Sequence, residues 1–128
     1  MPISHEQFVL WIDRIASLEG LMMDPEKLVE DLVLIADAFH QDPETFSVVM
    51  ENTFRAFQLI LRVRNVGTAL SGNKAGWISY HFQSHRVRRH KADMRIVYRD
   101  TGTAIQIMGF GHRWIPQSIY DRLSPPRP

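Results

Sequence analysis

The chain has 128 residues, 45% of them hydrophobic, which is enough for one core, so a single domain spanning residues 1–128 is expected. It has no cysteine, which excludes disulfides and thiolate metal sites. No apolar run approaches the roughly 20 residues of a membrane-spanning helix, and the N-terminus lacks the pattern of a secretory signal. We therefore expect a cytoplasmic protein that does not insert into a membrane.

The net charge of +1 hides an uneven distribution along the chain. Residues 1–64 contain 5 Lys/Arg and 11 Asp/Glu, a net charge of −6, whereas residues 65–128 contain 10 and 3, a net charge of +7. A basic C-terminal half favours a polyanionic partner. The same asymmetry also arises when two halves complement each other across an internal interface, and the two explanations are compatible.

Three helix start signals occur in the acidic half. In the first, Ser4 is a helix cap and Gln7 completes a capping box, with Gly20 as the predicted end. The other two are the Asp-Pro-Glu triplets at residues 24–26 and 42–44, each an N-cap followed by proline and an acid. Apolar residues follow each signal at helical spacing. Residues 1–64 are therefore predicted to form about three amphipathic helices.

Strand and turn patterns dominate the basic half. Residues 65–76 are rich in Gly, Ser and Asn and are predicted to be a linker. Alternation predicts strands at 77–82, 86–88, 94–99 and 103–110, with a turn at 100–102, and Pro116 is expected to begin a short helix through Leu123. The predicted class is α+β: about three N-terminal helices packed on an antiparallel sheet of about four strands with a short C-terminal helix. The helix beginning at Pro43 is expected to cover the sheet.

The period of a strand predicts one apolar and one cationic face for residues 94–99, because alternate side chains point to opposite sides. Met94, Ile96 and Tyr98 fall on the apolar face, and Arg95 falls on the cationic face. The acidic helices could form an added partner-binding domain or cover this basic face, and we hypothesise that they cover it.

The basic half holds the groups that metal-free RNA cleavage needs, namely a proton acceptor for the 2′-hydroxyl, cations for the phosphate and an acid for the leaving oxygen. Arg95 and Arg113 can hold a phosphate, His112 can titrate near neutral pH, and Tyr120 can stack on a base or donate a proton. Structural explanations are also open. The neighbouring Arg86, Arg88 and Arg89 suit the solvated side of a half-exposed sheet, Tyr120 suits a core, and His112 suits a turn.

Neither a metal nor another cofactor is predicted. His81 and His85 have i, i+4 spacing, but they lie in a predicted strand extension, where that spacing lacks helical geometry, and no carboxylate follows until Asp93. Glycine-rich phosphate loops and serine nucleophile elbows are absent from the sequence.

The run HRVRRHKADMRIVYRD, the following turn, AIQIMGFGHR and the nearby Tyr120 resemble the C-terminal half of the RelE/ParE superfamily of bacterial type II toxins. In that superfamily a strand with alternating basic residues leads to an x-R-[IVL]-[IV]-Y strand, then to an apolar strand ending in GHR or GKR, and a tyrosine follows in the last helix. The resemblance covers about residues 76–123. The matching positions are Arg86-Val87-Arg88, Met94 to Tyr98, Gly111-His112-Arg113 and Tyr120.

The resemblance implies a compact sheet with packed helices, an antitoxin protein as inhibitory partner and, in the RelE branch, ribosome-dependent mRNA cleavage without a metal. It implies that Arg95 and Arg113 stabilise the reacting phosphate and that Tyr120 stacks or transfers a proton. His112 lies where some members have lysine or histidine, which makes it a candidate acid or base. The residues implied to bind the RNA backbone are Arg86 and Arg88, with which we group Lys91.

In one respect the sequence departs from the superfamily. Members usually begin with a short strand and a two-helix hairpin, whereas no strand is predicted in residues 1–64. Three functions are therefore weighed: a RelE-like endoribonuclease toxin, a ParE-like toxin that acts on another target such as gyrase without cleavage, and a noncatalytic phage or plasmid interaction protein. The nuclease requires that Arg86, Arg88, Arg95 and Arg113 converge within reach of one phosphate.

Overall fold

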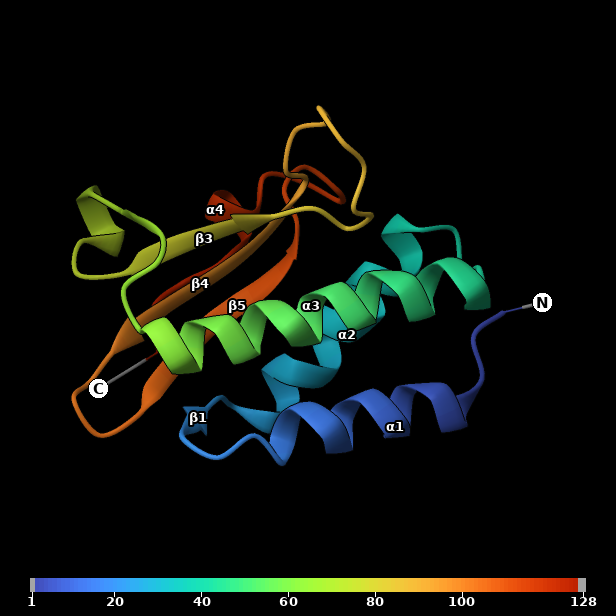
Figure 1. Cartoon of the computed structure of the whole chain (residues 1–128), viewed down its shortest axis with the longest axis horizontal. Coiled ribbons are helices and arrows are strands. Elements are labelled where there is room, and N and C mark those ends of the chain that lie inside the picture. The colour runs from blue at the N-terminus through green and yellow to red at the C-terminus, as the bar shows by residue number, and fades with distance from the viewer. Residues whose placement is uncertain (1, 127–128) are drawn as a thin grey trace.

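The computed structural model describes residues 2–126, in which helices cover one face of a five-stranded mixed sheet (Figure 1). The predicted α+β class is confirmed. No helix within this range is long and apolar enough to cross a bilayer. In chain order the elements are α1 (His5–Ala16), β1 (Leu21–Met22), α2 (Pro25–Ala38), α3 (Pro43–Val63), β2 (Thr68–Ala69), the 3-10 helix η1 (Gly72–Lys74), β3 (Ile78–Phe82), β4 (Met94–Asp100), β5 (Ile105–His112) and α4 (Ile119–Arg122).

The three helices of the acidic half begin where their capping signals predict. The capping box of α1 is formed, with the Gln7 amide 3.2 Å from Ser4 Oγ. Asp24 and Asp42 cap α2 and α3 by accepting bonds of 2.9 Å from amides in the first turn. The predicted end of the first helix is wrong: α1 ends at Ala16, and Gly20, with φ of +88°, instead turns the chain into β1.

The sheet has the strand order β1-β5-β4-β3-β2, with an antiparallel meander β3-β4-β5 at its centre that contains three of the four predicted strands. The prediction that no strand precedes residue 77 is wrong, because β1 pairs parallel with β5 and β2 pairs with β3. Two residues per strand are too few to produce an alternation pattern. Residues 65–76, predicted to be a linker, contain β2 and η1.

The predicted strand at Arg86-Val87-Arg88 is also wrong. Phe82 pairs directly with Met94, so β3 and β4 are neighbours and residues 83–93 form the loop that joins them. All three side chains of the predicted strand are exposed, hence no apolar face stabilises an extended conformation there.

The main core lies between the helices and the sheet face that carries Met94, Ile96 and Tyr98, as the strand alternation predicts. α3 contributes to this core, and the Phe57 ring meets the Phe110 ring of β5 edge-on at 5.1 Å. The hypothesis that the acidic helices cover the basic face is therefore wrong, since they cover the apolar one. The opposite face carries a second, smaller core completed by the C-terminal segment; its buried members are Trp77, Val97, Met108, Ile119 and Leu123.

A buried ion pair joins α2 to α4 across the outer edge of β5. β1 pairs only with the first two residues of β5. Farther along the same edge of β5, Asp31 Oδ2 accepts a 3.0 Å hydrogen bond from the Phe110 amide. Asp31 Oδ1 accepts a 2.7 Å bond from Arg122 Nη1. Burial raises the pKa of Asp31, whereas Lys27, the Phe110 amide and Arg122 act in the opposite direction. Asp31 thus serves as a fixed acceptor inside the fold.

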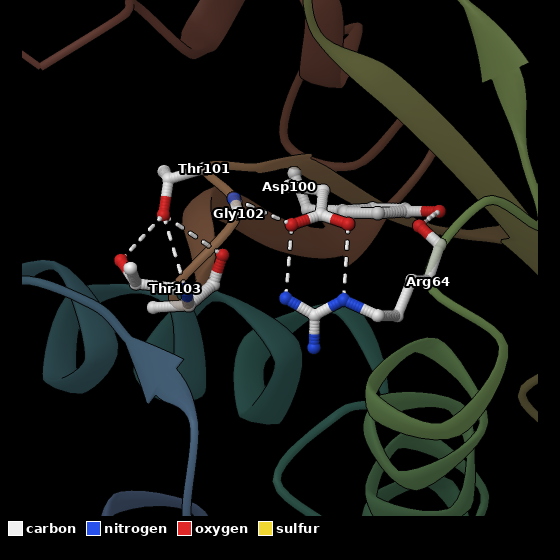
Figure 2. Close-up of polar contacts among 7 residues, drawn as sticks. Arg64, Asp100, Thr101, Gly102 and Thr103 are labelled. Atoms are coloured by element: carbon white, nitrogen blue, oxygen red, sulfur yellow. Dashed lines mark hydrogen bonds and ion pairs between the residues drawn. The ribbon is translucent and has the colours of Figure 1, made fainter.

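A second ion pair ties the end of α3 to the β4–β5 turn, as Figure 2 shows. Arg64 follows α3 with a left-handed φ of 71° and donates two bonds, of 3.0 and 2.9 Å, to the Asp100 carboxylate. Asp100 also accepts a 2.8 Å bond from the Gly102 amide within the turn. The Arg64 side chain is the first cause, and the Gly102 amide the second, of a lowered pKa at Asp100.

Replacing Asp31 by alanine is expected to lower the free energy of unfolding by about 3–5 kcal/mol, because it leaves the guanidinium of Arg122 buried without its partner. The measurement is urea unfolding followed by circular dichroism. Glu51→Ala, which removes a solvent-exposed pair with Arg14, is the control and is expected to cost less than about 1 kcal/mol. Equal effects of the two substitutions would contradict the structural role of Asp31.

Asp100→Asn is expected to reduce the dependence of stability on acid. A lowered folded pKa means that Asp100 stabilises the fold above its ordinary value of 3.8 and that this contribution is lost as the pH falls through the folded pKa. Unfolding is measured from about pH 2 to about pH 6, a range that extends to both sides of 3.8. The variant is expected to lose less stability than the parent as the pH falls. Glu19→Gln, at an exposed position with no ion pair in the described chain, is the control.

Candidate functional site

Polar side chains of β3, β4 and α4 meet on the sheet face that carries the smaller core. His81 pairs with Arg95 across β3 and β4, and Ser79 lies two residues earlier on the same face. The Tyr120 hydroxyl of α4 lies at the centre, 2.8 Å from Ser79 Oγ, 3.2 Å from Arg95 Nε and 3.3 Å from His81 Nε2. We call Ser79, His81, Arg95 and Tyr120 the Tyr120 cluster.

Arg95 is a buried cation, with only 4% of its surface exposed. Its Nη1 donates to the carbonyls of Ala92 and Met94 at 3.0 and 2.9 Å, which orients the guanidinium. None of the ion pairs within residues 2–126 includes Arg95. Because a buried charge without a counterion is unfavourable, an anion that reached this guanidinium would be stabilised by it.

His81 connects the cluster to solvent, since its side chain is exposed while its Nε2 faces Tyr120. Partial burial of the ring is the largest cause of a lowered pKa at His81, and the positive charges of Arg95 and Arg113 lower it further. The imidazole is therefore neutral near pH 7 and able to accept a proton. Arg113 is placed by its backbone, whose amide donates to Asp93 at 2.8 Å and whose carbonyl accepts from Ile119 at 3.0 Å.

Two of the four predicted catalytic residues, Arg95 and Tyr120, are in direct contact. The Arg113 guanidinium lies over the Trp114 ring, 4.6 Å from its centroid, and its charge acts on His81. His112 is on the other side of the sheet, with its ring 5.9 Å from that of Phe39 on the helical side. Its Nδ1 accepts bonds from the amides of Trp114 and Ile115, at 3.0 and 3.2 Å, and burial is the main cause of its lowered pKa. The structure places His112 as a turn-stabilising acceptor, the alternative that the sequence also allowed.

The predicted RNA-binding residues are all exposed in the 83–93 loop. Arg86 lines a groove between α3 and β3, together with Tyr80 and Phe82 on the helical side of the sheet. The expected convergence of four arginines on one phosphate is therefore wrong for Arg86. Arg95 pairs with His81 across the strands, and the charge of Arg113 also acts on the His81 ring. Arg88 and Lys91 form no ion pair within the described chain.

Sequence reasoning missed Ser79 and His81 as members of the site. Alternation already placed both on one face of the strand, but only the pairing of His81 with Arg95 shows that they adjoin the predicted cations. His81 was weighed solely as half of a metal pair. Within residues 2–126, no three His, Cys, Asp or Glu side chains are grouped so that they can hold a metal ion.

No protein-family model matches the chain, and no curated protein or solved structure was found to match it. The chemistry of the Tyr120 cluster and the motif order of the basic half are therefore the basis for a function.

Arg113→Ala is expected to raise the pKa of His81 toward its ordinary value of 6.5, because it removes one of the two cations that disfavour the imidazolium. The measurement is a titration of the histidine ring resonances by NMR, with His81→Gln used to assign the signal. Arg89→Ala, an exposed arginine of the 83–93 loop, is the control and is expected to leave the titration unchanged. A His81 pKa that does not respond to Arg113→Ala would place the two side chains too far apart to share a substrate.

Proposed function

We propose that the chain is a metal-independent endoribonuclease of the RelE type, the cytoplasmic toxin of a toxin-antitoxin pair, acting on mRNA at the ribosome. The observation that carries this proposal is the Tyr120 cluster, in which a buried arginine without a counterion lies beside a tyrosine hydroxyl and a histidine whose pKa is lowered. Cation, proton donor and proton acceptor are the set that phosphodiester cleavage by a 2′-hydroxyl requires.

In the proposed reaction, His81 Nε2 takes the proton of the 2′-hydroxyl as that oxygen bonds to phosphorus. The bond from phosphorus to the 5′-oxygen breaks, and Tyr120 donates a proton to that leaving oxygen. The products are a 2′,3′-cyclic phosphate and a 5′-hydroxyl. The imidazolium then returns a proton to the tyrosinate across the 3.3 Å contact. Arg95 and Arg113 stabilise the charge on the phosphate.

The order of elements also supports the proposal. From β1 onward the chain runs through a short strand, two helices, the two-residue strand β2 with the 3-10 helix η1, a three-stranded antiparallel meander and a terminal helix. Members of the RelE/ParE superfamily usually begin with a short strand and a two-helix hairpin, and β1, α2 and α3 follow that order. Of these three elements, only β1 was not predicted from the sequence. On this reading α1 is an N-terminal addition.

A second candidate is a toxin of the same superfamily that inhibits its target without cleaving RNA, as the ParE branch does. The observations that favour it are the 4% exposure of Arg95 and the position of Arg86 on the other side of the sheet. Both leave fewer cations in reach of a bound phosphate than the sequence predicts.

Expression of the chain is expected to arrest growth and to cleave transcripts, and His81→Ala and Tyr120→Phe are each expected to lower the cleavage rate by about 100-fold or more, since each removes a proton-transfer group. Cleavage is measured with purified protein and ribosome-bound mRNA. The rate is also expected to fall as the pH drops through the pKa of His81, which is lowered from its ordinary value of 6.5, because protonation of His81 removes the proton acceptor.

His112→Gln is the matched control, since His112 lies outside the Tyr120 cluster, and it is expected to keep the cleavage rate within about threefold of the parent. Growth arrest with intact transcripts would support the noncatalytic toxin instead. Absence of growth arrest, with the protein folded, would favour the noncatalytic interaction protein.

A further inference from the structure

A groove of about 380 Å³ separates α3 from the outer part of β3, on the opposite side of the sheet from the Tyr120 cluster. The Tyr80 and Phe82 rings line it, nearly parallel at 13° with their centroids 6.0 Å apart. Three arginines also line it, Arg55 and Arg62 from α3 and Arg86 from the loop after β3. Neither the function proposed above nor the smaller core uses this groove.

The charges around the groove are not neutralised within the described chain. Residues 1–64 contain five basic side chains, and the three of them outside the groove, Arg14, Lys27 and Arg64, all form ion pairs. The other two, Arg55 and Arg62, are exposed and form none, and the same is true of Arg86. No carboxylate lines the groove. Its electrostatics therefore favour an anionic occupant.

The strand beside the groove has an open edge. β2 pairs only with Ile78 and Ser79, so the segment from Tyr80 to Phe82 has no strand on its outer side within residues 2–126. An extended polypeptide can add to such an edge through main-chain hydrogen bonds, with alternate side chains entering an adjoining groove. Single-stranded RNA can meet the arginines but cannot continue the sheet.

We propose that this groove and the open edge of β3 form a docking site for an acidic polypeptide segment of a partner protein. The segment binds in extended conformation as an added strand. Its alternate side chains lie over Tyr80 and Phe82, and its carboxylates pair with Arg55, Arg62 and Arg86. This site depends on no step of RNA cleavage and can be tested whether or not the chain is a nuclease.

The test uses the full chain and fluorescein-labelled ten-residue peptides, with binding measured by anisotropy. The probes are a peptide of alternating leucine and glutamate, the same peptide with lysine for glutamate, the glutamate peptide N-methylated at alternate residues, and a ten-nucleotide uridine RNA. The variant is Arg55→Glu with Arg62→Glu, and the control is Arg88→Glu with Arg89→Glu, two exposed arginines that do not line the groove. Thermal unfolding checks that both double variants are folded.

The glutamate peptide is expected to bind the parent and the control equally, and the groove variant at least tenfold more weakly. N-methylation is expected to weaken binding at least tenfold, because it blocks strand pairing, and the lysine peptide is expected not to bind. Amide exchange at His81, whose N–H points to the open edge, is expected to slow on binding. The proposal is overturned if no peptide binds, if N-methylation has no effect, or if the RNA binds more tightly than the peptide and loses affinity in the groove variant.

Discussion

The carboxylate of Asp31 is the interaction on which the arrangement of the sheet and its C-terminal segment depends. From α2 it accepts a hydrogen bond from the Phe110 amide of β5 and an ion-paired bond from Arg122 of α4. A side chain at Gly109 would overlap the Leu123 side chain and crowd Asp31, so the glycine lets the C-terminal segment lie against β5 without a shift of Leu123. One side chain of α2 thus holds two consecutive elements from far along the chain, β5 and α4, at one edge of the sheet.

This pair specifies position more than it adds stability. Nε and Nη2 of Arg122 are buried and have no hydrogen-bond partner in the described chain, so the cost of removing the guanidinium from water is only partly offset. What the pair does define is the location of α4, and with it Tyr120, two residues before Arg122. A helix of four residues has little intrinsic stability, hence the orientation of the tyrosine hydroxyl depends on this contact and on the small core around Ile119.

The helices and the meander were predictable because their signals are local. Capping residues and apolar spacing locate α1, α2 and α3, and alternation locates β3, β4 and β5. β1 and β2 were not predictable, because two residues contain no period and their stability comes from partners far along the chain. The loop at Arg86 shows that alternation alone is not enough, because Arg86, Val87 and Arg88 are all exposed and no buried face stabilises a strand there.

The site was predictable in part for the same reason. Arg95, Arg113 and Tyr120 were identified from their motifs, whereas the contribution of His81 depends on the pairing of β3 with β4. Pairing register is a long-range property: a shift by one residue would turn His81 to the helical side and Tyr80 toward Tyr120. The role of His112 was open for a similar reason, because only the packed structure shows its ring against Phe39.

The alternation of β3 also explains how one strand can contribute side chains both to the Tyr120 cluster and to the groove beside α3. Ser79 and His81 point to the face with Arg95 and Tyr120, while Tyr80 and Phe82 point to the groove beneath α3. An occupant of the groove that also continued the sheet would lie along the backbone of His81, between the two surfaces. Proton-transfer chemistry on one face and recognition of an acidic chain on the other are therefore compatible in a strand of five residues, because consecutive side chains never share a face.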